Sequence, residues 1–276
     1  MGIEQNRSGG KNKVSSESRK NKRKQRKSSQ VQKLYETCKE VFDDCGPGIV
    51  PAPEKVEKLA SVLDEMTQAD LGIRPDMPFF SSKRAPIITY LQLHECEQFS
   101  IGIFCLPPKS VIPLHNHPGM TVFSKLLFGT MHIKSCDWSS EFDETNDSSA
   151  TAIATLPKSM LFFESKGHRN ELRVAKIKVD SDFTAPCKTS ILYPAEGGNM
   201  HRFTARSACA VLDVIGPPYC DPEGRHCQYY SEFPFASFSG DNEKKKEGYT
   251  LLKEREKPED HIVVGAQYNG PKIAKK

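Results

Sequence analysis

The sequence predicts a mainly β protein, a barrel or jelly roll of short antiparallel strands with two helices packed outside the sheet. From about Pro86 onward, short runs of β-branched and aromatic residues alternate with Gly, Pro, Asn, Asp and Ser, which is typical of strands joined by turns. Before Pro86, apolar residues recur at the three- and four-residue spacing of amphipathic helices. These two patterns together indicate one β domain that carries its helices at the N-terminal side.

Two helices are expected before the strands begin. Apolar residues fall on one face of the first helix, over residues 31–42, and Cys45-Gly46-Pro47-Gly48 supplies its stop signal. The second helix starts at Pro53, a residue that suits a first helical turn. Its apolar face contains Val56, Leu59, Ala60 and Leu63.

Nine strands follow from the alternation of apolar runs and turn signals. They are expected at Ile87–Leu93, Phe99–Leu106, Val111–His115, Thr121–Phe128, Gly129–Cys136, Glu171–Val179, Ser190–Tyr193, Arg202–Thr204 and Cys209–Ile215. Two further segments, Tyr249–Lys253 and His261–Ala266, are expected to pair at the edge of the sheet. The acidic, Ser-rich segment 139–150 and the charged segment 240–246 are interpreted as solvent loops.

Residues 1–30 are predicted to be a disordered basic tail, because almost nothing apolar is available there to form a core. Residues 1–33 hold 11 Lys and Arg against 2 Asp and Glu, whereas the other 243 residues carry a net charge of −5. Residues 21–27 place five positive charges in seven positions, which indicates a nuclear-import peptide or a polyanion contact. The alternative is a solvated tail that no partner recognises. The expected localisation is therefore nucleus and cytoplasm.

Composition also excludes several classes of protein. The acidic body argues against direct nucleic-acid binding, since basic residues would have to lie on the folded surface. No apolar run approaches the roughly 18 residues of a membrane span, and no signal peptide is recognisable. Nine cysteines without a CxxC motif favour reduced thiols over a disulfide framework or a zinc ribbon. Residues 31–276 are accordingly interpreted as a single intracellular domain, expected to be monomeric.

Three histidines form the most informative pattern. His115 and His117 are two positions apart, so on a strand they would point to the same face with Cα atoms about 6.6 Å apart. A second segment, Tyr193 to His201, contains a Pro and two glycines that make a tight turn and deliver His201 at the start of a β segment. Three imidazoles from two strands inside a barrel would bind one metal ion.

These two segments resemble the two motifs of the cupin family, the first with its HxH and the second with its Gly-x-x-His. Many metal cupins place a Glu three or four residues beyond the HxH pair, but Thr121 and Val122 occupy those positions here. Without a carboxylate, three neutral imidazoles leave a divalent ion at +2 with open positions, which favours an anionic substrate such as a thiolate, with dioxygen as the second reactant. The chemistry implied is oxidation of a thiol to a sulfinic acid.

The order of segments from about Val31 to the C-terminus resembles the plant cysteine oxidases and, more distantly, animal cysteamine dioxygenase. The residues that carry the resemblance are Pro113-Leu114-His115-Asn116-His117-Pro118-Gly119-Met120, Tyr193-Pro194, Gly198-Asn199-Met200-His201 and Asp213-Val214-Ile215-Gly216-Pro217-Pro218-Tyr219. The resemblance implies a cupin double-stranded β-helix over residues 31–276 and an Fe(2+) enzyme that oxidises the N-terminal cysteine of target proteins with dioxygen. It further implies an oxygen sensor of the N-degron pathway whose partners include transcription factors.

Three more residues are candidates for catalytic roles. Asp213 lies in an apolar run, and the resemblance places the matching Asp near the iron, where it would hydrogen-bond a ligand histidine or receive the substrate's α-ammonium; a structural acid is the alternative. Tyr219 follows two prolines, and its phenol is a candidate to hydrogen-bond dioxygen or the sulfur. Cys227 and Tyr229 resemble the thioether-linked pair of cysteamine dioxygenase; alternatively, Cys227 is a small buried apolar residue.

Other interpretations stay open at this stage. Three histidines and a water also describe a catalytic zinc site, which would make the chain a hydrolase-type cupin. A non-enzymatic nuclear cupin with a structural metal is a second alternative. Free cysteine as substrate would require an arginine fork for its carboxylate, and the sequence does not tell which arginine would supply it. The remaining histidines, His94, His132, His168, His226 and His261, are not expected to be ligands.

Overall fold

The computed structural model describes residues 28–81, 86–140, 172–235 and 248–274 of the 276-residue chain. The helices are α1 (Gln30–Phe42) and α2 (Pro53–Glu65), with short 3-10 turns η1 (Ala69–Leu71), η2 (Pro78–Phe80) and η4 (Asp221–Glu223). The strands are β1 (Ile88–Glu95), β2 (Ser100–Leu106), β3 (Val111–His115), β4 (Thr121–Phe128), β5 (Thr130–Trp138), β6 (Arg173–Thr184), β7 (Ser190–Leu192), β8 (Met200–Ala205), β9 (Cys209–Gly216), β10 (Tyr229–Pro234), β11 (Tyr249–Arg255) and β12 (Val263–Ala266).

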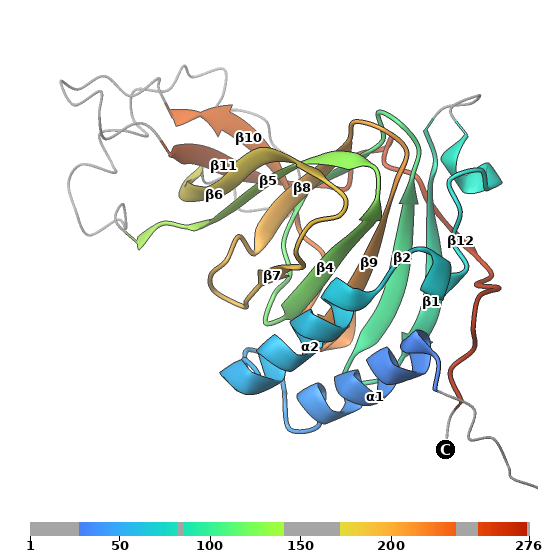
Figure 1. Ribbon diagram of the computed structural model, residues 1–276. Coiled ribbons are helices and arrows are strands. Elements are labelled where there is room, and N and C mark those ends of the chain that lie inside the picture. The colour runs from blue at the N-terminus through green and yellow to red at the C-terminus, as the bar shows by residue number, and fades with distance from the viewer. Residues whose placement is uncertain (1–27, 82–85, 141–171, 236–247, 275–276) are drawn as a thin grey trace, which may run out of the picture.

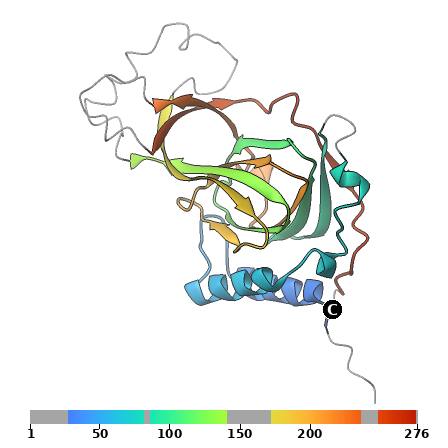
Figure 2. The ribbon, with the colours of Figure 1, turned by 45° about the horizontal axis from the view of Figure 1, so that its top comes forward.

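The strands form two sheets (Figures 1 and 2). One is six-stranded, in the order β12-β1-β2-β9-β4-β7, and the other closes on itself in the order β10-β11-β6-β5-β8-β3. Every pair is antiparallel except β1 with β12, which is parallel. An apolar core lies between the sheets, with Leu126 and Val211 from the first facing Ile133 and Phe203 from the second. This arrangement confirms the predicted mainly β class and the double-stranded β-helix.

Helices α1 and α2 cover the outer face of the six-stranded sheet, as Figure 1 shows. Helix α1 begins where the Ser29 hydroxyl accepts a hydrogen bond from the Gln32 amide at 3.1 Å, which satisfies one of the free N–H groups of the first turn. The apolar positions predicted for this helix are all buried: Val31, Leu34, Tyr35, Cys38, Val41 and Phe42. The predicted helices and their position outside the sheet are thus confirmed.

Phe42 connects the helical layer to the sheet. Its ring is fully buried and lies 6.0 Å from the Phe99 ring and 6.4 Å from the Phe123 ring, centroid to centroid. We expect Phe42→Ala to lower the free energy of unfolding by about 3–5 kcal/mol, because it removes buried apolar area and leaves a cavity. Urea unfolding measures this loss. Truncation of the half-exposed Ile49 is the matched control, and an equal effect at both positions would contradict the assigned packing.

Several sequence predictions need correction. Strand β10 was not predicted, and Tyr249–Lys253 is not at a sheet edge, since β11 pairs with both β10 and β6 inside the closed barrel. Of the two segments predicted at the sheet edge, only His261–Ala266 contributes an edge strand, β12, which pairs with β1. Helix α1 begins at Gln30, the last residue of the predicted tail.

Other sequence predictions concern segments that lie partly or wholly outside the described residues. These are the disorder of residues 1–27, most of the 139–150 loop and the 240–246 loop. Among the helices of the described residues, none combines the length and hydropathy that a membrane span requires.

Candidate metal centre

Strands β3 and β8, which are neighbours in the closed barrel, and the loop after β3 bring the three predicted histidines to one point. His115 ends β3, His201 lies on β8, and the two residues are opposite each other in the antiparallel register. One ligating atom from each of His115, His117 and His201 lies within 4.8 Å of the others, and all three side chains are buried. The Nε2 atoms of His117 and His201 are 3.2 Å apart.

His117 is not placed by a strand, as the HxH spacing had suggested. Strand β3 ends at His115 after an irregularity between Ile112 and His115, and His117 lies in the loop that follows. The Asn199 side chain fixes this loop, because its Oδ1 accepts from the His117 amide at 3.1 Å and its Nδ2 donates to the His117 carbonyl at 2.8 Å. The expected convergence of the two imidazoles is therefore right, but its structural cause is a loop clamp.

Hydrogen bonds set the orientation of two of the rings. The Nδ1–H of His115 donates to the Pro113 carbonyl at 2.8 Å, which leaves its Nε2 lone pair free. Tyr219 lies between His117 Nδ1, at 2.9 Å, and the Asn116 carbonyl, at 2.8 Å. A carbonyl only accepts, so the phenol donates to Asn116 and accepts from His117 Nδ1–H. The Nε2 of His117 is then also a bare donor for a metal.

Burial keeps these imidazoles neutral. It lowers the pKa of His115 to about 4 and holds the pKa values of His117 and His201 well below the usual range. Repulsion from neighbouring ligand rings adds to the effect for His117 and His201, and repulsion from His261 adds to it for His115. The bare His117 Nε2 faces His201 Nε2 at 3.2 Å, and a cation that took the place of a proton between them would bind both nitrogens. The donor set therefore fits a divalent metal ion of the kind that imidazole prefers.

The turn before His201 is built around a buried carboxylate that sequence reasoning missed. Asp137 accepts hydrogen bonds from the amides of Gly198, at 3.0 Å, and Asn199, at 2.7 Å. Gly197 and Gly198 have φ values of +80° and +86°, a region that favours glycine. Asp137 and Asn199 thus position the second motif, and no local sequence pattern around Asp137 marks this role.

We expect Gly198→Ala to destabilise the fold by about 2 kcal/mol or more and to weaken metal binding. A Cβ at this position would require a left-handed conformation and would overlap the Ser135 hydroxyl. The measurements are the melting temperature and the metal content after dialysis. Gly224→Ala is the control, since φ there is +75° but a Cβ would meet open space. If the two variants behaved alike, strain rather than the close contact would be the cause.

Asp213 lies on β9, opposite Gly102 on one side and Ser124 on the other, and shares a face with Val211 as predicted. Its Oδ1 is buried without a hydrogen-bond partner among the described residues. Burial raises the pKa of Asp213 to about 7, and a hydrogen bond from Ser124 opposes this shift. Within the described chain no hydrogen bond joins it to the three histidines, so the suggested bond to a ligand histidine is not seen. The contact with substrate and the structural role both stay predictions.

Tyr219 and Cys227 both belong to the surroundings of the metal centre. The Tyr219 phenol contacts His117, and hydrogen bonding with Tyr229 and Tyr219 lowers the pKa of Cys227, although burial outweighs this and raises it. Tyr229 pairs in register with His115. The structure therefore brings the sulfur and both phenols together beside one ligand.

Comparison with known proteins identifies the family of the chain. A family model described as PCO_ADO matches residues 62–273. The chain belongs to the PCO_ADO family. It is 54% identical to Plant cysteine oxidase 1 of Arabidopsis thaliana over 88% of the chain and 80% of the relative, and 57% identical to Plant cysteine oxidase 2 over 88% and 83%. It is 30% identical to human 2-aminoethanethiol dioxygenase over 80% of the chain and 82% of the relative.

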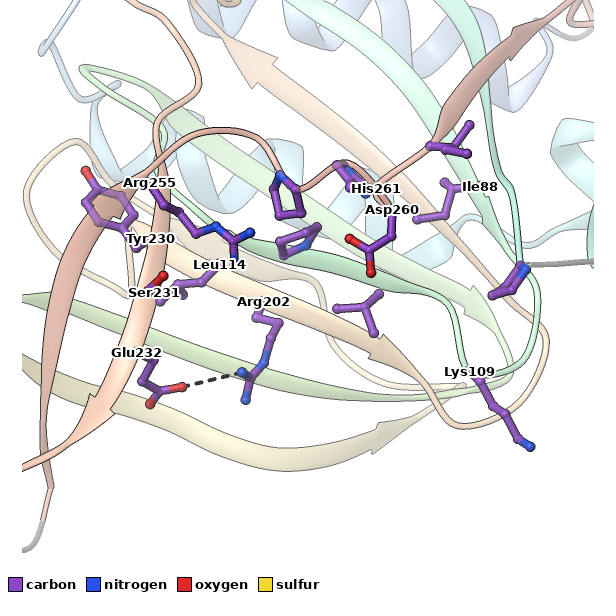
Figure 3. Close-up of a pocket in the computed structure, with 15 residues that line it drawn as sticks. Ile88, Lys109, Leu114, Arg202, Tyr230, Ser231, Glu232, Arg255, Asp260 and His261 are labelled. Atoms are coloured by element: carbon purple, nitrogen blue, oxygen red, sulfur yellow. Dashed lines mark ion pairs between the residues drawn. The ribbon is translucent and has the colours of Figure 1, made fainter. Parts of the chain in front are cut away.

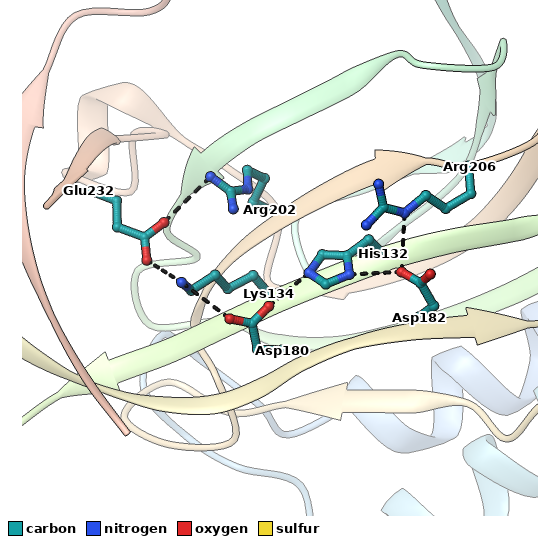
Figure 4. A network of polar contacts seen from close by, with 7 residues as sticks. All are labelled: His132, Lys134, Asp180, Asp182, Arg202, Arg206 and Glu232. Atoms are coloured by element: carbon teal, nitrogen blue, oxygen red, sulfur yellow. Dashed lines mark hydrogen bonds and ion pairs between the residues drawn. The ribbon is translucent and has the colours of Figure 1, made fainter. Parts of the chain in front are cut away.

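The other histidines that the structure describes in this PCO_ADO protein have different contacts. His94 packs against Tyr35 and Phe99, His261 packs against Tyr229, and His132 lies between Asp180 and Asp182 in the network of Figure 4. None of these joins the ligating group found in the described residues, as is also true of the exposed His226, whereas His168 falls outside them.

No arginine fork for a free carboxylate is apparent in the described part of the site. Arg202 follows a ligand in sequence but points to the other face of β8, where it pairs with Glu232 at 3.4 Å (Figure 4). Arg206 pairs with Asp182, and Arg173 stacks on Trp138. Arg84 and Arg169 lie outside the described residues.

Proposed function

We propose that this protein is an Fe(2+)-dependent thiol dioxygenase that oxidises the N-terminal cysteine of target proteins to cysteine sulfinic acid. The observation that carries the proposal is a centre of three neutral imidazoles without a carboxylate, in a chain that belongs to the PCO_ADO family. The names of its relatives, plant cysteine oxidases and 2-aminoethanethiol dioxygenase, support a thiol substrate.

The donor set explains why a thiol suits this centre. His115, His117 and His201 would bind the ion through nitrogen and leave its charge uncompensated, which favours a thiolate in the pocket. Thr121 and Val122, where many cupins have a Glu ligand, are buried on β4 and offer no carboxylate. When bound, Fe(2+) would supply the redox chemistry that allows a thiol and dioxygen to react.

Asp213 would orient the substrate through its amino terminus. The buried Oδ1 without a partner is an acceptor, and an α-ammonium is the donor that an N-terminal cysteine brings. Tyr219 would keep the His117 ring in place through the hydrogen bond to Nδ1 and remain close to the Cys227 sulfur. The overall reaction is balanced, because one thiol and one dioxygen give one sulfinic acid, R–SO₂H.

We further propose that the enzyme acts as a monomeric oxygen sensor in nucleus and cytoplasm, feeding the N-degron pathway, and that its targets include transcription factors. The basic run at residues 21–27 supports nuclear import, and the relatives' names support the cysteine substrate. Light scattering on the purified chain would test the monomer, and deletion of residues 21–27 in cells would test the import.

Reconstitution with different metals tests the reaction class. Metal-free protein is loaded with Fe(2+) or Zn(2+), and oxygen uptake is followed with an N-terminal Cys peptide. We expect uptake only with Fe(2+). Uptake with neither metal, together with zinc in the protein as purified, would favour the hydrolase-type cupin. If the protein were a non-enzymatic metal-binding cupin, the wild type would show no turnover, and His115→Ala would impair folding or partner binding.

A substrate comparison tests the choice of a peptide over a free thiol. Free cysteine and cysteamine are compared with an N-terminal Cys peptide by their kcat/KM values. We expect the peptide to be preferred, since the described site offers no arginine fork for a free carboxylate. Equal or better turnover of cysteine or cysteamine would contradict this choice.

A further inference from the structure

A groove of about 680 Å³ lies where strands β3 and β10 separate (Figure 3). These strands pair at one position, Tyr229 with His115, whereas β10 pairs with β11 along its whole length. Leu114 and Tyr230, the neighbours of that single pair, line the groove. The groove therefore lies on the opposite face of β3 and β8 from the three histidines, which do not line it. His261 connects the two places, because it lines the groove and its ring packs against Tyr229, the partner of His115.

Exposed aliphatic side chains gather around this groove. Six large apolar side chains are exposed in the described residues, and four of them lie on the strands and loops that border it: Ile87, Val111, Ile262 and Val264, at 38%, 39%, 50% and 41% exposure. Val111 and Ile262 line it directly, and Ile88 with Val263 joins the two segments in parallel register. These side chains give the border of the groove apolar surface that a bound segment would cover.

The charges of the groove favour an acidic occupant. Arg255 and Lys109 line it, and neither has an ion-pair partner among the described residues. In Figure 3, Arg255 points into the space beside Asp260, and Lys109 lies at the opposite end. Glu232 is already shared by Lys134 and Arg202, which leaves Asp260 as the one unpaired acid against two unpaired cations among the described lining residues.

Lys109 also has an unusual backbone. Its φ is +71°, the one positive value of a non-glycine residue in the described chain. This left-handed conformation is less favourable for lysine than for glycine, and such outliers concentrate at functional positions. Lys109 lies in a turn that is closed by the hydrogen bond from the Ser110 amide to the Pro107 carbonyl at 3.2 Å, and its side chain lies at the end of the groove (Figure 3).

We propose that the groove binds the downstream segment of the substrate polypeptide, an extended stretch with aliphatic side chains followed by an acidic residue. The inference rests on the proposed function, since it assigns a second contact to a protein whose N-terminal cysteine is oxidised. An extended segment fits a groove bordered by strands, with its aliphatic side chains on Val111 and Ile262 and its carboxylate at Arg255 or Lys109. This contact would distinguish long substrates from short ones.

The experiment compares peptides that share the start Cys-Gly-Gly-Gly on the Fe(2+)-loaded full chain. One is the tetrapeptide, and two are longer by a Gly-Ser linker that ends in Val-Leu-Glu-Glu or in Val-Leu-Lys-Lys. We expect kcat/KM for the acidic peptide to exceed that for the basic peptide about fivefold or more, with the difference falling in high salt. Arg255→Glu and Lys109→Gly should each remove most of the difference and leave tetrapeptide turnover unchanged.

Lys109→Gly also suits the left-handed backbone, so it tests the charge without a risk to folding. Arg74→Glu is the matched control, because Arg74 is exposed and lies outside the groove, next to Asp76. Fluorescence anisotropy of the same long peptides with Ser in place of Cys reports binding without chemistry. Equal binding of acidic and basic peptides would contradict the proposal that the groove binds an acidic segment. Selective binding of the acidic peptide without any oxidation would contradict the proposed function alone.

Discussion

The His201→Ala variant is expected to lose metal affinity by more than about 100-fold and thiol oxidation with it. Loss of a group that only orients a ligand already costs 10–100-fold, and removal of a ligand costs more. Three neutral nitrogens are the whole donor set that the described residues offer, so two cannot retain the ion. The measurements are metal content after dialysis and oxygen uptake with an N-terminal Cys peptide.

His132→Ala is the matched control for this experiment. That ring contacts Asp180 and Asp182 on another face of the closed barrel (Figure 4), so its loss should leave metal content intact. The secondary structure of both variants is checked by circular dichroism. Full metal content in folded His201→Ala protein would show that the three histidines do not form the site.

Asp213→Asn is expected to slow oxidation of an N-terminal Cys peptide at least about 100-fold while the protein keeps its metal. The buried Oδ1 has no hydrogen-bond partner in the part of the chain that the structure describes, and an amide cannot supply the negative charge that an α-ammonium needs. The measurements are kcat/KM and metal content on the same preparations. Unchanged kinetics would remove the substrate role, and parallel loss of metal and rate would indicate a structural one.

The same substitution has a second consequence, on stability. The pKa of Asp213 rises from 3.8 to about 7 in the fold, so between these values the folded protein binds a proton that the unfolded chain does not. Stability from this group is therefore full below about pH 4 and is lost as the pH rises through 7, by about 4 kcal/mol in total. Asp213→Asn removes this decline, and the metal-free variant should exceed metal-free wild type in stability at pH 8.

Urea unfolding of metal-free wild type and Asp213→Asn at pH 5 and pH 8 measures this difference. The buried histidines titrate in both proteins, so their contribution cancels in the comparison. Asp260→Asn is the control, because Asp260 is exposed. Equal pH dependence in wild type and Asp213→Asn would show that Asp213 is charged and compensated in the fold.

Local patterns were enough to predict the helices and most strands. Helix α1 follows from apolar residues on one face and a Gly-Pro stop, and β4 matches its predicted bounds, since both signals lie within a few residues of sequence. The ligand histidines were found because two short motifs contain them. The departure from the cupin pattern at Thr121 and Val122 was equally local.

Long-range features could not be predicted in this way. The role of Asp137 depends on the Gly198 amide, which is 61 residues away, and Asn199 fixes His117 across 82 residues. Strand β10 mixes polar residues with Pro234, and its pairing with β11 and with His115 is decided by barrel closure. The groove beside β3 arises because β10 and β3 pair at one position only, and no local sequence pattern indicates this.

The most direct test is the mass of an N-terminal Cys peptide after incubation with the Fe(2+)-loaded protein in air. The proposed chemistry adds about 32 Da, two oxygen atoms on the cysteine sulfur, and both atoms become heavy when the gas is ¹⁸O₂. Conversion to a disulfide, a gain of one oxygen, or label from water instead of dioxygen would contradict it.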